Sequence, residues 1–219
     1  MRWSIGVVWA AALMSIPTEA ADSSTYFDAE TGFTFAQFNG LFQIGKGILY
    51  RVAVPSPVPA NASYDVVFQI VAPIAVGWTG LAWGGGMVRS PLTVTWQNGQ
   101  TVTIGSRYAT GHSMPSVYPN AVYTKFKTGT KVNSTHWQVT AKCSGCSTFI
   151  GSTNSQVTLP PKGVNRLAFA ESNSKPATPS SSTSTFNVHD VTNSFTADFA
   201  SAGNTEFAAL VAKNGEATN

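Results

Sequence analysis

One short stretch of the chain carries residue types that suit the binding of a flat ligand. Gly84, Gly85 and Gly86 stand directly before Met87. Glycine loses more backbone entropy on folding than any other residue, so three in succession need a local reason. Close approach of the backbone to a flat ligand is one such reason, and Met87 would offer that ligand a soft sulfur atom. The alternative is a glycine-rich turn whose methionine fills an irregular gap in the core.

The two cysteines, Cys143 and Cys146, are separated by two residues. In an oxidising compartment an even pair is read first as a disulfide. A thioredoxin-like redox pair needs a βαβ context that this sequence lacks, and two cysteines without nearby histidines make a poor zinc site. We therefore predict a small structural disulfide loop.

The N-terminus reads as a secretory signal peptide. A basic start at Arg2 is followed by an apolar run from Ile5 to Ile16 and by small residues at Ala20 and Ala21, the order typical of such a leader. The run is shorter than the roughly 20 apolar residues that a membrane span needs. We expect residues 1–20 to be removed, the mature protein to be secreted and extracellular, and no segment to span a membrane.

The composition limits the partners. Charged residues make up 11% of the chain and the net charge is +3. Lys and Arg are scattered singly, so nucleic acid is not expected as a partner. Asn61-Ala62-Ser63 and Asn133-Ser134-Thr135 are acceptor sequons, which predicts glycosylation of Asn61 and Asn133 in a secreted protein.

The elements that must position these residues are short strands. Alternation of apolar and polar residues predicts strands over Tyr64–Val71, Leu92–Trp96 and Thr101–Ile104, and Asn98-Gly99 between the last two indicates a hairpin. Further strands are expected at Gly47–Val54, Ala121–Lys127, Thr135–Lys142, Arg166–Glu171 and Thr185–Val191. A helical pattern is expected only over Thr205–Ala212.

Many short strands in about 200 mature residues predict one all-β domain, an antiparallel two-sheet β-sandwich of immunoglobulin-like type. We assign residues 21–219 to this single domain, with its core at about 27–200. The low-complexity run Lys175–Ser184 is interpreted as a long exposed loop inside the domain, because strand-like sequence resumes at Thr185.

Motifs of common hydrolases and oxidoreductases are missing from the sequence. Asp65, Glu171, Asp190 and Asp198 form no paired motif of the kind a glycosidase needs. Neither a Gly-x-Ser-x-Gly elbow nor a His-Glu-x-x-His helix is present. A dinucleotide-binding Gly-x-Gly-x-x-Gly after a strand is also missing. The residues themselves therefore do not predict an enzyme.

Several segments together resemble a known family. Gly84-Gly85-Gly86-Met87, the strand after it and Asn98-Gly99 are similar to the cytochrome domain of fungal cellobiose dehydrogenases. Further segments agree in order and extend the resemblance from about Phe27 to Ala200: Arg107-Tyr108-Ala109-Thr110-Gly111, Asn133-Ser134-Thr135-His136-Trp137 running into Cys143-Ser144-Gly145-Cys146, and Leu167-Ala168-Phe169-Ala170.

The resemblance implies a sandwich related to DOMON domains that holds haem b between strand ends and loops. In that family one Met and one His bind the iron, and the haem passes electrons from a flavin domain to an acceptor. The family's methionine falls on Met87, with Gly85, Gly86 and Tyr108 as further haem contacts, and its disulfide falls on the cysteine pair. Met/His ligation raises the reduction potential, as suits an electron carrier.

The family's histidine does not follow in the same way. Its final motif aligns here with the segment from Asp190 to Phe199, and the ligand position falls on Phe195, whose phenyl ring has no lone pair for iron. We expect Phe195 to cap the far side of the haem. His189, six residues upstream, and His112, in an expected loop, are the substitutes to consider, whereas His136 is expected on the surface.

Two functions remain open from the sequence. The first is a secreted cytochrome that carries electrons between an extracellular flavin dehydrogenase and an oxidative enzyme or ferric iron. The second is a haem-free module of the same ancestry that binds a sugar or another small ligand. In the second case Trp78, Trp83, Trp96 and Tyr108 would line a pocket or pack the core, with the core favoured for Trp96.

Overall fold

The computed structural model describes residues 20–43, 46–59 and 62–215. The expected signal peptide, except for Ala20, and the sequon residue Asn61 therefore lie outside the described residues. Within the described ranges, no helix has the length and apolar character that crossing a bilayer requires.

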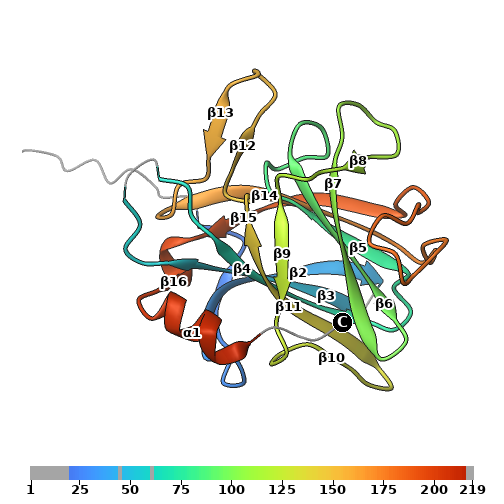
Figure 1. The fold of residues 1–219 in the computed structure, drawn as a ribbon, viewed down its shortest axis with the longest axis horizontal. Coiled ribbons are helices and arrows are strands. Elements are labelled where there is room, and N and C mark those ends of the chain that lie inside the picture. The colour runs from blue at the N-terminus through green and yellow to red at the C-terminus, as the bar shows by residue number, and fades with distance from the viewer. Residues whose placement is uncertain (1–19, 44–45, 60–61, 216–219) are drawn as a thin grey trace, which may run out of the picture.

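Two mostly antiparallel sheets face each other (Figure 1). One sheet has the order β1-β2-β3-β4-β11-β10, with β16 on β3 and β9 on β11; the other has the order β15-β14-β5-β6-β7-β8. The first contains β1 (Ser24–Phe27), β2 (Thr34–Gln43), β3 (Lys46–Pro55), β4 (Val66–Pro73), β9 (Val122–Lys125), β10 (Lys131–Val132), β11 (His136–Ser144) and β16 (Gly203–Asn204). The second contains β5 (Trp78–Ala82), β6 (Pro91–Asn98), β7 (Thr101–Tyr108), β8 (Ser116–Val117), β14 (Val164–Ser172) and β15 (Val191–Asp198). The β-sandwich prediction is confirmed.

Smaller elements complete the described chain. A separate hairpin joins β12 (Thr148–Ile150) to β13 (Gln156–Thr158), a 3-10 turn covers Ala200–Ala202, and one helix, α1, spans Phe207–Asn214. Cys143 and Cys146 form the expected disulfide, with 5.8 Å between their Cα atoms.

The core between the sheets follows the two-residue period of strands. Val52, Phe68 and Ile70 of the larger sheet meet Leu81 and Leu167 of the smaller one, and all are buried. Burial of this apolar layer is the main stabilisation of the sandwich, at about 25 cal/mol per Å² of apolar surface. Residues between these positions point outward, so each sheet also has an outer face to cover.

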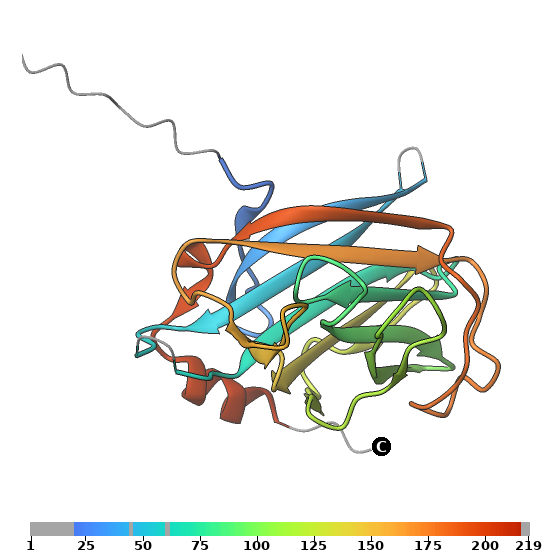
Figure 2. The same cartoon turned by 90° about the horizontal axis from the view of Figure 1, so that it is seen from above.

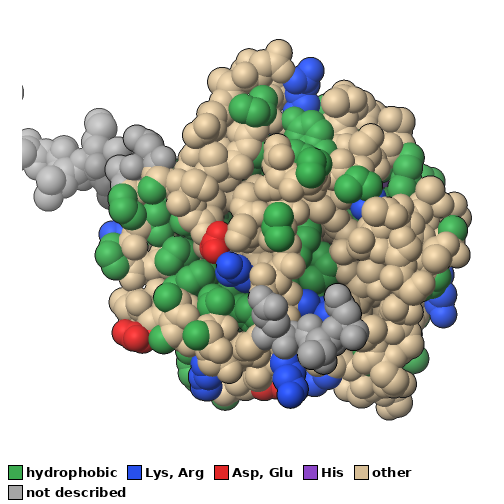
Figure 3. All heavy atoms as spheres, in the orientation of Figure 1, with side chains coloured by type: hydrophobic (Ala, Val, Ile, Leu, Met, Phe, Trp, Pro, Cys, Tyr) green, Lys and Arg blue, Asp and Glu red, His purple; other side chains and the backbone are tan. Residues whose placement is uncertain are grey.

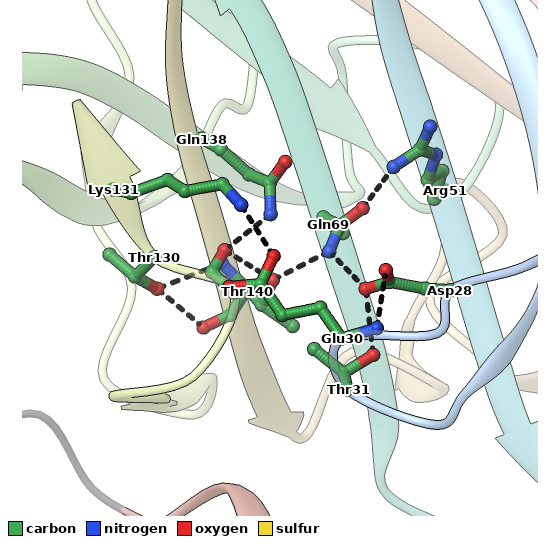
Figure 4. A network of polar contacts seen from close by, with 10 residues as sticks. Asp28, Glu30, Thr31, Arg51, Gln69, Thr130, Lys131, Gln138 and Thr140 are labelled. Carbon is green, nitrogen blue, oxygen red and sulfur yellow. Dashed lines mark hydrogen bonds and ion pairs between the residues drawn. The ribbon is translucent and has the colours of Figure 1, made fainter. Parts of the chain in front are cut away.

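On the outer face of the larger sheet, α1 packs on an apolar cluster, and a separate buried polar network joins a turn to the strands (Figure 4). The carboxylate of Asp28 accepts hydrogen bonds from the Thr31 hydroxyl (2.8 Å) and from the Gln69 amide (3.0 Å). Gln69 also donates to the Thr140 hydroxyl (2.9 Å) and accepts from Arg51. Because each polar group is paired, the network fastens the turn to three strands without leaving a buried charge alone.

Most strand predictions are confirmed with small shifts, and two are corrected. The hairpin predicted at Asn98-Gly99 turns one residue later, because Asn98 pairs with Thr101. Gly99 (φ 59°) then takes the first turn position, where a type II′ turn needs glycine. The strand predicted over Thr185–Val191 was wrong, since β15 begins only at Val191 and the preceding residues form no ladder.

The surface is poor in charge, as the composition indicated. On the face seen in Figure 3, acidic and basic side chains are sparse and lie within uncharged surface. Two ion pairs occur among the described residues, Lys131 with Glu30 and Lys142 with Asp65. Such exposed pairs contribute little to stability.

The expectation that Phe195 caps a ligand site was wrong. Phe195 is 3% exposed and its ring stacks on that of Phe38, with centroids 4.1 Å apart and planes 5° from parallel. Its Cα pairs with Leu167, another core residue. Successive side chains of a strand point to opposite faces, and Phe195 points to the core between the sheets.

Phe195→Ala should destabilise the fold by about 3–5 kcal/mol, because a fully buried aromatic ring is lost and a cavity is left between the sheets. The free energy of unfolding from urea titration measures this. The control is Phe27→Ala, because Phe27 lies on the edge strand β1 and is 62% exposed. Equal costs for the two changes would contradict the core assignment.

A carboxyl group is also buried between the sheets. Glu171 on β14 is 1% exposed, and neither of its carboxyl oxygens has a hydrogen-bond partner among the described residues. Burial raises the pKa of Glu171 to about 7, with a smaller contribution from Asp190. The group therefore keeps its proton in the folded chain well above the pH at which an unfolded chain loses it, at about 4.3.

This difference predicts a pH-dependent stability. Between about pH 4 and 7 the unfolded state binds fewer protons than the native state, so the free energy of unfolding falls as pH rises. Glu171→Gln should remove up to about 3 kcal/mol of that fall. Urea titrations from pH 4.5 to 7.5 measure it, with the same change at exposed Glu206 as the control. A wild-type and Glu171→Gln difference that stays constant across this range would refute the prediction.

Candidate functional site

A cavity of about 540 Å³ lies on the outer face of the smaller sheet. Its floor consists of small residues that point away from the core, Gly80 and Ala82 on β5 and Ala168 and Ala170 on β14. In the register of these strands, Gly80 pairs with Ala170 and Ala82 with Ala168. Four small side chains side by side leave a shallow, apolar hollow where larger ones would fill the space.

Larger apolar side chains form the walls of the hollow. Trp78, Leu92 and Val94 come from β5 and β6, and Phe186 comes from the segment between β14 and β15. The rings of Trp78 and Phe186 pack with centroids 4.7 Å apart. The lining is therefore mostly apolar with a few polar groups, as is usual for sites that bind a cofactor.

Met87 reaches the cavity from the loop between β5 and β6. Two hydrogen bonds close this loop: Gly84 N donates to Ser90 Oγ (2.7 Å), and Arg89 N donates to Ala109 O (2.8 Å). Met87 is half-buried and packs against the apolar cluster below the cavity. These hydrogen bonds fix the position of the loop that carries Met87.

Gly84 and Gly85 leave little room for a side chain, and a Cβ on Gly84 would lie 3.1 Å from the Phe149 ring and from Ser90. Gly85 has a φ of 77°, and a Cβ on it would lie 3.0 Å from Cγ of Arg166. A Cβ on Gly86 would meet no atom within 4 Å. Gly85 therefore allows the tight turn against β14, whereas Gly86 borders open space in the cavity wall, as close approach to a ligand requires.

The segment from 173 to 190, which we call the strap, forms the opposite wall. It leaves the end of β14 and returns to the start of β15 as the orange loop at the right of Figure 2. The expected loop over Lys175–Ser184 belongs to it, and many of its side chains are exposed. The strap is nevertheless fixed to the sheet, because Trp96 Nε1 (2.7 Å) and Thr103 Oγ1 (2.8 Å) both donate to Pro179 O.

His189 lies near the end of the strap, half-buried, and lines the cavity. The next residue, Asp190, holds this end in place. Its carboxylate accepts hydrogen bonds from Asn173 N and Ser172 Oγ, both at 2.8 Å, and its own N donates to Glu171 O (2.7 Å). These bonds lower the pKa of Asp190, the backbone bond from Asn173 most.

His112 also lines the cavity, from the loop between β7 and β8, but it is exposed. Met114 on the same loop is 43% exposed at the rim. The structure thus brings Met87 together with both histidines that the sequence singled out. His136 is exposed on β11 and lies outside the cavity, as expected.

One cationic side chain borders the apolar hollow. Arg166 lines the cavity, and its guanidinium donates to Ser194 Oγ (2.9 Å). A ligand with an apolar body and an acidic edge would suit this arrangement.

Several residues considered from the sequence lie elsewhere. The hydroxyl of Tyr108 donates to Ile150 O (2.8 Å), and its ring stacks on Tyr118 with centroids 5.0 Å apart. Tyr108, which was expected as a haem contact, is not part of the cavity lining. Trp83 is fully buried in the core and donates to Thr93 Oγ1 (2.8 Å), and Trp96 packs beneath the strap as expected for a core residue.

Sequence reasoning missed the floor of the cavity and Phe186. A signal was present, because Gly80-x-Ala82 and Ala168-x-Ala170 place small residues on one face of each strand. Small residues at alternate positions of two strands predict a ligand-binding surface only when the two strands are known to be neighbours in the sheet. That adjacency arises only in the folded sheet.

Comparison with known proteins agrees with this geometry. The family model for the cytochrome domain of cellobiose dehydrogenase matches residues 26–209. A pyrroloquinoline quinone-dependent pyranose dehydrogenase from Coprinopsis cinerea is 28% identical over 179 residues, which are 81% of this chain and 24% of that protein. The chain thus spans about a quarter of the length of this relative.

Two solved structures have the same fold. The cytochrome b domain of pyranose dehydrogenase from Coprinopsis cinerea matches with a TM-score of 0.76 and 25% identity, covering 88% of this chain and 95% of that domain. The cytochrome domain of cellobiose dehydrogenase from Myriococcum thermophilum matches with a TM-score of 0.78 and 24% identity, covering 92% of this chain and all of that domain. The present chain therefore belongs to the family of the cytochrome domain of cellobiose dehydrogenase.

Proposed function

We propose that this chain binds haem b in the cavity on the smaller sheet and carries electrons, with Met87 and His189 as the axial ligands. The observation that carries the proposal is that one apolar cavity gathers a methionine and a histidine from separate, well-anchored segments. A thioether and an imidazole together are an axial pair found in electron-transfer haem proteins.

The residues present fit this group. A floor of small residues under a volume of about 540 Å³ suits a flat macrocycle, and cofactor sites of this size are ordinary. Arg166 offers a cation at the edge for the haem carboxylates. Among the described residues no three His, Cys, Asp or Glu side chains gather as a metal site, so the donors present suit an iron already held by a porphyrin.

When bound, haem b supplies an iron that accepts and releases one electron. The chain's own residues set how easily it does so. The Met87 sulfur favours the reduced iron and raises the reduction potential. The apolar walls from Trp78, Leu92 and Phe186 keep water away from the site, and a dry site also favours the less charged, reduced form.

His189 is the better candidate for the second ligand. Its neighbour Asp190 makes three hydrogen bonds to β14 and the residue after it, which restricts where the His189 ring can lie. His112 is exposed, and within the described part of the chain no hydrogen bond of this kind anchors residues 110–115. A ligand that is already placed loses less conformational entropy on binding than a mobile one.

We further propose that the protein acts outside the cell with a dehydrogenase as electron donor, because the matched domains belong to pyranose and cellobiose dehydrogenases. An exposed Asn133 suits glycosylation, since its Oδ1 accepts hydrogen bonds from Thr135 N (2.9 Å) and Thr135 Oγ1 (3.0 Å) at a turn.

A haem-free module for sugars is the weaker proposal, because it assigns no role to the gathering of Met87 and His189.

Replacing each histidine separately tests the ligand assignment. With haemin added, the purified wild type should give a low-spin six-coordinate visible spectrum. His189→Ala should convert it to a high-spin spectrum and weaken haem binding by about tenfold or more, since a direct bond to iron is lost. His112→Ala is the matched control and should keep the wild-type spectrum. The opposite pattern would transfer the assignment to His112, and a wild type that takes up no haem would refute the proposal.

Met87→Ala tests the sulfur ligand independently. Loss of the thioether should lower the reduction potential by on the order of 100 mV, because axial ligands set much of the potential range of haem proteins. Spectroelectrochemical titration measures this shift. Met114→Ala, which removes an exposed methionine from the cavity rim, is the control and should leave the potential close to that of the wild type. An unchanged potential in Met87→Ala would mean that Met87 only fills space.

A further inference from the structure

Arg107 on β7 has an unusual environment. It is 1% exposed, and among the described residues no carboxylate lies within ion-pair distance of it. Burial lowers the pKa of its guanidinium, which nevertheless stays charged at neutral pH. A buried charge without a counter-ion is costly, so its neighbours must compensate by hydrogen bonding.

The strap supplies that compensation. The Nη2 group of Arg107 donates to Ser184 O (2.9 Å), and its guanidinium carbon lies 5.8 Å from the centroid of the Phe186 ring. Its Nη1 group donates to Ser106 O (3.1 Å) on the same strand. Arg107 therefore joins β7 to the strap through a hydrogen bond to a carbonyl and through a contact with an aromatic ring. A guanidinium makes both contacts better than an ammonium does.

Ser184 is also the residue that organises the strap internally. Its hydroxyl accepts from Thr178 N (2.8 Å), and Ala177 N donates to Thr185 O (2.9 Å). The strap approaches β7 closely, because a Cβ on Gly105 would lie 2.8 Å from Ser182 O. The part of the strap that Arg107 holds is thus a compact loop pressed onto the sheet.

His189 follows Phe186 by three residues. The segment from Ser184 to Asp190 is held at one end by Arg107 and at the other by the hydrogen bonds of the Asp190 carboxylate. His189 is placed by both anchors, and the sequence shows neither of them as a contact. Release of the Arg107 end would let Phe186 leave the cavity wall and let the His189 ring move.

We propose that Arg107 is a positioning residue for His189, acting through Ser184 and Phe186 of the strap. This inference rests on the proposed haem function. It states that Arg107 fixes the position of the proposed iron ligand, His189, without touching it. Nothing in the hydrogen bonding of Arg107 requires haem, so the strap itself can be examined in the haem-free chain.

The test begins with Arg107→Met, which keeps much of the volume and removes both contacts. In the haem-loaded variant we expect a mixture of low-spin and high-spin spectra and a haem dissociation constant raised about tenfold or more, as for the loss of a charged hydrogen bond. Added imidazole, which replaces a displaced histidine ligand, should restore the low-spin spectrum. In the haem-free variant, hydrogen exchange at Ala177 and Thr178 should quicken about tenfold or more.

Arg51→Met is the matched control. Arg51 is also a buried arginine (7% exposed), but it lies in the polar network of the larger sheet and makes no contact with the strap. It should lower stability without changing the spectrum. If Arg107→Met does not fold, Arg107→Lys serves in its place, because lysine keeps the charge but not the planar fork.

A double-variant cycle identifies the route of the effect. In a His189→Ala background, Arg107→Met should change haem affinity by less than about twofold, because the residue that it positions is already gone. An undiminished effect in that background would overturn the inference. If the wild type is low-spin and the Arg107→Met variant gives the same spectrum, the inference is overturned while the proposed function stands. A wild type that binds no haem would overturn the proposed function and this inference together.

Discussion

The site depends on a steric constraint, the absence of side-chain bulk on the outer face of two neighbouring strands. Gly80 and Ala82 lie beside Ala170 and Ala168, and this patch cannot cover itself. A sheet face of this kind must be buried by something else, because exposed apolar surface is unfavourable. Here the Met87 loop and the strap cover its edges and leave its centre as a cavity.

Both covering segments are held mainly by backbone groups. Gly84 N and Arg89 N fix the Met87 loop, whereas the carbonyls of Pro179 and Ser184 fix the strap. Loops fixed in this way tolerate many side chains, and the run rich in Ser, Thr and Pro precedes the residues of the strap that line the cavity, Phe186 to His189. The side chains that fix the strap are Trp96, Thr103 and Arg107 on the sheet and Asp190 at the end of the strap.

The inner and outer faces of the smaller sheet therefore have different roles. Its inner face packs on the larger sheet through residues such as Leu167 and Phe195, and it includes the buried carboxyl of Glu171. Its outer face carries the small residues and the cavity. Phe195 lies within β15 and points to the inner face, whereas His189, six residues upstream, lies in the strap before β15 begins and lines the cavity.

The sequence by itself determined the fold class, most strands and the disulfide between Cys143 and Cys146, and it singled out Met87 as a candidate ligand. These features follow from local chemistry, namely alternation, turn residues and the glycines before Met87. Only the tertiary structure placed His189 on the same cavity as Met87, because the two are 102 positions apart and reach that cavity through the pairing of β14 with β5 and the anchoring of the strap. Contacts between distant segments depend on strand register and on backbone hydrogen bonds, and neither can be read from residue types along one chain.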